Sequence, residues 1–105
     1  MATNIRPELS KKNPYYIDRK RFFELKYLCL QYPDIKKADK LDKRIQIIEK
    51  AAMEANASLK EHILLSVTKG YTYWNLKTMH NIPCGRKYFY EQYRKFFWLL
   101  DQSRD

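Results

Sequence analysis

Apolar and polar positions recur at a helical spacing through residues 70–101 and divide this stretch into a short and a long segment. Thr72 predicts the cap of a short helix that contains Tyr73, Leu76 and Met79. A turn is expected over 80–85, because its proline lacks an amide donor and its glycine is permissive. A longer helix should begin near Gly85, and its apolar stripe consists of Phe89, Tyr93, Phe96, Phe97 and Leu100. Short helix, tight turn and longer helix are the plan of a helix-turn-helix, here at about 72–101.

A first helix is predicted from Arg19 to about Gln31, with Asp18 as its N-cap. Its broad apolar face contains Phe22, Phe23, Leu25, Lys26, Cys29 and Leu30. Pro33 should end this helix or start the next, because the residue before a proline is pushed out of the α region. Three basic residues, 19–21, fall in the first turn, where positive charge opposes the helix dipole. They are either a solvated charge run or a phosphate contact.

A second helix should start between Asp34 and Asp39 and reach Ala55. Its stripe is heptad-like and consists of Ala38, Leu41, Ile45, Ile48, Ala52 and Ala55. Because the stripe lasts less than three heptads, a core face is favoured over a dimer seam, and a homodimer stays open.

A third helix is expected over roughly Leu59 to Lys69, after a capping box formed by Ser58 and Glu61. Gly70 stands where a C′ glycine belongs. The inward side chains are Leu59, Ile63, Leu64 and Val67. We therefore predict an all-α fold, a compact bundle of about five helices. Residues 1–14 form a flexible basic arm, and residues 15–105 form a single helical domain.

Composition agrees with one helical domain. The 105 residues are 45% hydrophobic and 15% aromatic, which is enough for one packed core. Only two glycines occur, which disfavours a sheet with several hairpins.

Charge points to a polyanionic partner. Twenty-one Lys and Arg against twelve Asp and Glu give a net charge of +9. Such an excess favours nucleic acid first, and an acidic protein or a membrane surface second. The alternative is that the basic charge only keeps a small protein soluble.

The C-terminal stretch carries a resemblance. The motifs 82–86 (Ile-Pro-Cys-Gly-Arg), Phe89-Tyr90 and 93–100 (Tyr-Arg-Lys-Phe-Phe-Trp-Leu-Leu) resemble the C-terminal motif of small phage regulators of the RinA/ArpU type. Those proteins are similar in turn to region four of sigma factors. Tyr27–Asp34 also resembles the N-terminal segment of such proteins, so the resemblance covers about Tyr15 to Arg104. It implies an all-helical transcriptional regulator that binds DNA in phage or mobile-element settings.

Helical geometry assigns roles to the side chains of this region. Residues near the start of the second helix of a helix-turn-helix reach base edges. The candidate base contacts are Lys87, Tyr88, Glu91 and Gln92. The candidate phosphate contacts are Lys77, Arg86, Arg94, Lys95, Arg19 and Arg21. An exposed Trp98 beside Tyr90 is an alternative patch for docking a protein.

Other chemistry has little support in the sequence. Cys29, His62, His80 and Cys84 lack the paired spacing of a zinc site, so we expect no metal and no cofactor. No catalytic triad, carboxylate pair or phosphate-binding glycine loop stands out, so an enzyme is not expected. Two cysteines make no disulfide framework, and neither a signal peptide nor a membrane-spanning run is present. We expect a cytoplasmic protein of a bacterial host cell with no membrane partner.

The sequence therefore predicts a sequence-specific regulator that binds double-stranded DNA. Two alternatives stay open. One is a phage DNA-packaging accessory that uses the same helices on DNA. The other is a protein-binding module that docks on RNA polymerase or on a host defence nuclease, as an anti-CRISPR-like inhibitor would.

Overall fold

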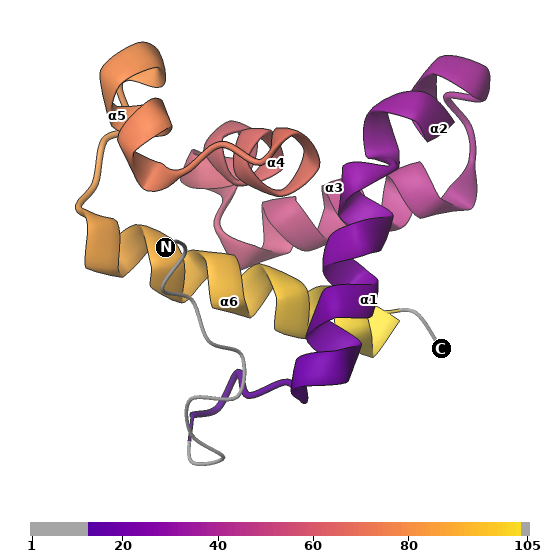
Figure 1. Ribbon diagram of the computed structural model, residues 1–105, viewed down its shortest axis with the longest axis horizontal. Helices are drawn as coiled ribbons and strands as arrows, with labels where there is room; N and C mark the ends of the chain where they lie inside the picture. The colour runs from indigo at the N-terminus through magenta and orange to yellow at the C-terminus, as the bar shows by residue number, and fades with distance from the viewer. Residues whose placement is uncertain (1–12, 104–105) are drawn as a thin grey trace.

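Six α-helices and one short 3-10 helix account for the regular structure of residues 13–103, the part of the chain that the computed structural model describes (Figure 1). They are α1 (Arg19–Leu30), α2 (Tyr32–Ala38), α3 (Lys43–Ala55), η1 (Ala57–Leu59), α4 (Lys60–Lys69), α5 (Tyr73–His80) and α6 (Arg86–Ser103). This stretch contains no strand. The predicted all-α bundle is confirmed. Of the predicted basic arm, 1–14, residues 1–12 lie outside the described residues.

Several helix ends follow from local chemistry. The carboxylate of Asp18 accepts a hydrogen bond from the backbone N–H of Lys20 over 3.1 Å, which confirms the predicted cap of α1. Gly70 ends α4 with φ at 77°, a left-handed conformation that glycine adopts without steric cost. The predicted Ser58 capping box is wrong. Ser58 lies inside η1, and Asn56 is the cap instead, because its side-chain oxygen accepts the N–H of Leu59 over 3.2 Å.

The predicted second helix is two helices. Pro33 falls in the first turn of α2, where the missing N–H of proline has no helical partner to lose. The chain is then non-helical until Asp42, whose carboxylate accepts the N–H of Arg44 and starts α3. Because of this break, Ala38 and Leu41 do not join the buried stripe of α3, and Leu41 is 78% exposed.

The core is organised around α6, which runs alongside α3, while α1 crosses its C-terminal half (Figure 1). All five residues of the predicted apolar stripe of α6 are buried, and four of them are aromatic. Phe97 is central to their packing, with ring centroids 4.9 Å from Phe96, 5.0 Å from Phe22 and 5.1 Å from Tyr93. The residues facing these rings from α3 are Ile45, Ile48, Ala51, Ala52 and Ala55, all buried in the same core. The apolar stripe therefore fixes the rotation of α6 about its axis.

Three apolar side chains that the spacing placed inward are on the surface. Phe23 and Leu30 of α1 and Met79 of α5 are all classed as exposed. Phe23 and Leu30 are each one position away from a buried neighbour, and Met79 is three positions from Leu76, the buried residue of α5, so the predicted apolar faces were too broad. None of the helices in residues 13–103 combines the length and the apolar character needed to cross a membrane.

Candidate nucleic-acid interface

The region 72–103 has the predicted order of short helix, connection and long helix. Thr72 and Asn75 form a capping box at the start of α5: the Thr72 hydroxyl accepts the N–H of Asn75 over 3.2 Å, and the Asn75 side chain accepts the N–H of Thr72 over 2.9 Å. Asn81 ends the helix in a left-handed conformation, with φ at 49°. The hydroxyl of Tyr73 donates to the backbone oxygen of Cys84 over 2.7 Å. These contacts hold the connection against α5.

The first turns of α6 separate apolar from charged side chains. Phe89 is fully buried, whereas Lys87, Tyr88 and Glu91 are exposed. The charged side of the helix therefore faces away from the core at its N-terminal end. This is the part of the helix from which the base contacts were predicted.

The four predicted base contacts do not form a single row. At about 100° per residue, Lys87 and Glu91 share one line along α6, and Tyr88 and Gln92 share another, a quarter-turn away. On the second line, Tyr88 lies toward the end of α3, because its hydroxyl accepts a hydrogen bond from the Asn56 amide over 3.0 Å. Gln92 is half-buried. Lys87 and Glu91 are consequently the better exposed pair.

The start of the described chain lies against the outer side of α6, which the sequence did not indicate. Ile17 is anchored in the core, and the Tyr15 ring packs on Trp98 with centroids 5.8 Å apart. A hollow of about 290 Å³ separates this segment from α6 and is lined by Asn13, Pro14, Tyr15, Glu91, Gln92 and Arg94. A duplex that approached Glu91 would meet this segment as well.

The predicted docking patch is not an exposed surface. Trp98 is half-buried beneath Tyr15. Tyr90 is also half-buried, and its hydroxyl accepts the backbone N–H of Tyr73 over 3.2 Å. Both rings hold neighbouring segments in place. The most exposed of the large aromatics of this region is Trp74 on α5, which is 64% exposed and which the stripe of α5 did not single out.

Two of the predicted phosphate contacts, Arg86 on α6 and Lys77 on α5, each lie over an aromatic ring. The guanidinium of Arg86 lies over the Tyr90 ring, 5.3 Å from its centroid, and the ammonium of Lys77 lies over Trp74 at 5.4 Å. Both Arg86 and Lys77 are exposed. Aromatic rings attract cations electrostatically and so hold these charges at the surface. Arg94 and Lys95 are half-buried.

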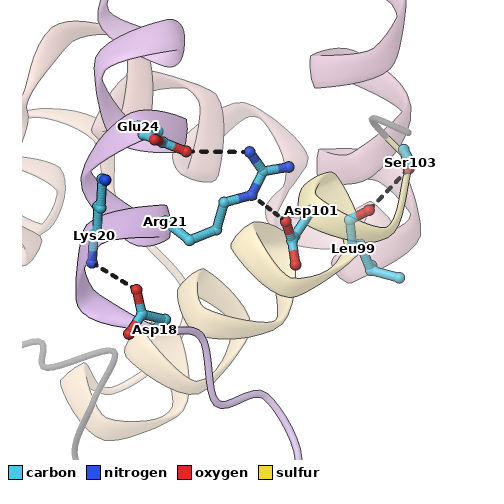
Figure 2. Close-up of polar contacts among 7 residues, drawn as sticks. All are labelled: Asp18, Lys20, Arg21, Glu24, Leu99, Asp101 and Ser103. Carbon is cyan, nitrogen blue, oxygen red and sulfur yellow. Dashed lines mark hydrogen bonds and ion pairs between the residues drawn. The ribbon is translucent and has the colours of Figure 1, made fainter.

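Arg19 and Arg21 lie at the other end of the molecule. Arg21 contacts Asp101 at 2.5 Å and Glu24 at 3.2 Å, so it bridges α1 to the last turn of α6 (Figure 2). Asp101 is fifteen residues from Arg86, which is about 22 Å along a helix. The same acidic neighbours raise the pKa of Arg21, Asp101 first. Arg21 therefore has an intramolecular role, and Arg19 stands over Phe23 at 5.7 Å.

Comparisons with known proteins give no relative to guide the assignment. No protein-family model, curated protein or solved structure matches the chain. The resemblance to phage regulators stays an expectation from the sequence.

The potential metal ligands are spread over different elements. In residues 13–103, no three His, Cys, Asp or Glu side chains come together as a metal site would require. Cys29 is buried in α1, and burial raises the pKa of the half-buried Cys84 thiol, which disfavours a thiolate. His62 makes a 3.0 Å contact through Nε2 with the backbone oxygen of His80. That contact joins α4 to the end of α5, a structural role.

Proposed function

We propose that this chain binds double-stranded DNA, with the first turns of α6 entering the major groove and α5 lying across the sugar-phosphate backbone. The observation that carries the proposal is the division of α6 between a fully buried Phe89 and the exposed pair Lys87 and Glu91. A recognition helix needs one side fixed in a core and the other free at its N-terminal end. The net charge of +9 supplies the attraction to phosphate that such binding requires.

The side chains suit different parts of a duplex. Lysine donates to guanine acceptors, and a carboxylate accepts from the cytosine amino group, so Lys87 and Glu91 are the proposed base contacts. Tyr88 and Gln92 would complete the base contacts from the second line of the helix. Arg86, Arg94, Lys95 and Lys77 would hold phosphates, which fix position but carry no sequence information. Arg21 is not included, because Asp101 and Glu24 already bind it.

We further propose that this binding regulates transcription in a phage or a mobile element, as the resemblance implies. A module that docks on RNA polymerase or a defence nuclease finds less support, since Trp98 and Tyr90 hold other segments of the chain. A packaging accessory would use the same interface and would differ in where its binding sites lie on the phage genome.

The test is selection from a randomised duplex pool, followed by fluorescence anisotropy of the selected duplex over a range of salt concentrations. We expect a selected sequence and a log–log salt slope of several units. Lys87→Ala should weaken binding about 5- to 150-fold and relax the preference at one position. Lys43→Ala is the matched control: it removes the same charge from an exposed site about 20 Å along α3 from Asn56. Equal effects of the two variants, or no enrichment of any sequence, would refute the proposal.

A further inference from the structure

Helix α1 exposes a row of large apolar side chains, although the guanidinium of Arg19 lies over one of them, the Phe23 ring. Phe23, Tyr27 and Leu30 are 49%, 67% and 44% exposed. Their spacing of four and then three residues puts them on one side of the helix, and we name them the α1 stripe. The opposite side of α1 buries Phe22 and Leu25 in the core. A contiguous apolar row of this kind on a small protein marks a contact surface.

The charges along α1 are arranged against its own dipole. Its first turn contains no acidic residue and begins with Arg19 and Lys20, although the positive end of a helix dipole disfavours cations. Its last turn contains no basic residue. Asp34, which is exposed, follows Leu30 by four residues. Asp34 belongs to the first turn of α2, just beyond the end of α1, so the stripe has cations at its start and a carboxylate beyond its end.

We propose that the α1 stripe binds a second copy of this chain, with the two α1 helices antiparallel across a two-fold axis near Tyr27. Lys20 and Asp34 are each seven residues from Tyr27 in sequence. Because Asp34 stands in the first turn of α2, just beyond the end of α1, a two-fold axis there turns the Lys20 end of each α1 toward the Asp34 end of its partner. The cationic start of each α1 also meets the negative end of its partner's dipole. A parallel pairing would place like charges together.

Antiparallel pairing fits what is known of such surfaces. Identical subunits associate most often through a two-fold interface in which the same patch meets itself. In an antiparallel pair, the cations at the start of one α1 meet the carboxylate beyond the end of the other. An unrelated partner would need its own apolar row with the same arrangement of charges. Three side chains on one helix make a contact smaller than a standard interface of about 800 Å² per partner. The dimer is therefore expected to be weak, in the micromolar range or above.

The pairing does not depend on DNA binding, since it uses α1 and the proposed reading surface lies on α6. If the proposed function also holds, the dimer would recognise a two-fold symmetric duplex, and that consequence rests on the proposed function. The two are separated by measuring association without DNA.

The test is sedimentation equilibrium of the full chain, without DNA, from micromolar to near-millimolar concentration. We expect a reversible monomer–dimer equilibrium that Tyr27→Glu weakens at least tenfold. Met53→Glu is the control, since Met53 is an exposed apolar residue on α3. It should leave the dimer unchanged. A monomer at every concentration, or a dimer insensitive to Tyr27→Glu, would overturn the proposal.

Charge reversal tests the antiparallel register. Lys20→Asp alone and Asp34→Lys alone should each weaken the dimer several-fold, because each places like charges together. The double variant should restore the wild-type dissociation constant, since the ion pairs re-form with opposite polarity. Circular dichroism of each variant verifies the helical fold. A double variant weaker than both single variants would refute the antiparallel pairing.

Discussion

The side-chain amide of Asn56 donates a hydrogen bond to the hydroxyl of Tyr88 over 3.0 Å. The oxygen of the same amide accepts the N–H of Leu59 and so starts η1. One side chain thus links the end of α3, the start of the next helical segment and the first turn of α6. The position of a proposed base-contacting residue is consequently coupled to a helix cap on another element.

This coupling predicts different results for two substitutions of Asn56. Asn56→Ala removes both the cap and the donor to Tyr88, and should lower the free energy of unfolding by about 1 kcal/mol. Asn56→Asp keeps an oxygen that can accept the Leu59 N–H, so it should stay within about 0.5 kcal/mol of wild type. Urea denaturation of both variants measures the difference. Equal losses would show that the cap contributes nothing.

Aromatic packing predicts a large contrast between two phenylalanines. Phe97 is fully buried among three other rings, and Phe97→Ala should lower the free energy of unfolding by about 3–5 kcal/mol. Phe23→Ala removes the same side chain from an exposed site and should change it by less than about 0.5 kcal/mol. Thermal unfolding at low protein concentration avoids a contribution from association. A small effect at Phe97 would contradict a core built around α6.

A polar cluster between α2 and α3 predicts a pH-dependent contribution to stability. The Tyr32 hydroxyl donates to the carboxylate of Glu49, and the Lys36 ammonium lies 3.2 Å from it, so the pKa of Glu49 is lowered by Tyr32 first and Lys36 second. Because the pKa of Glu49 is lowered in the folded state, its ionised carboxylate stabilises the fold at pH values above the pKa of glutamate in the unfolded chain, about 4.3. The contribution is lost as the pH falls through the lowered folded pKa.

Tyr32→Phe should therefore raise the pKa of Glu49 toward its ordinary value. Because the Glu49 side chain is 34% exposed, the cost at neutral pH should be only about 1 kcal/mol. The difference in the free energy of unfolding between Tyr32→Phe and wild type should shrink as the pH falls below the pKa of Glu49 in the folded state. Carbon-detected NMR titration of Glu49 gives the pKa directly. An unchanged pKa would show that the hydroxyl does not stabilise the carboxylate.

The ion pair between Arg21 and Asp101 predicts a separation of stability from DNA affinity. Both side chains are about one-third exposed, so a double-mutant cycle with Arg21→Gln and Asp101→Asn should give a coupling of no more than about 1 kcal/mol. Arg21→Gln should reduce duplex affinity less than Arg94→Gln, which removes the same charge beside the proposed interface. Anisotropy titrations at one salt concentration compare them. A larger loss of duplex affinity for Arg21→Gln than for Arg94→Gln would place the DNA-binding surface at α1.

Local sequence signals predicted the arrangement of the C-terminal region well. Thr72 and Gly70 act within a few residues of themselves, so their capping roles could be inferred before any contact was known. The stripe from Phe89 to Leu100 is regular enough to fix both the helix and its buried side. These features determine where Lys87 and Glu91 face.

Contacts between distant segments could not be predicted in the same way. Arg21 was grouped with the phosphate contacts because its partner, Asp101, lies eighty residues away. The cap is Asn56 and not Ser58, because the helical segment begins at Ala57, two residues earlier than the capping pattern indicated. Tyr15 covers Trp98 through a segment with no periodicity of its own. The exposed surface of α6 is therefore narrower than a helical projection of its sequence implies.

The central claim is that the exposed side of the first turns of α6 contacts a DNA duplex. Amide chemical-shift mapping by NMR, with the selected duplex added to labelled protein, tests it most directly. We expect the largest shifts at 72–95, centred on Lys87 and Glu91, and small shifts in α2 and at Arg21. Shifts confined to α1 and α2, with residues 86–92 unchanged at saturating duplex, would contradict the claim.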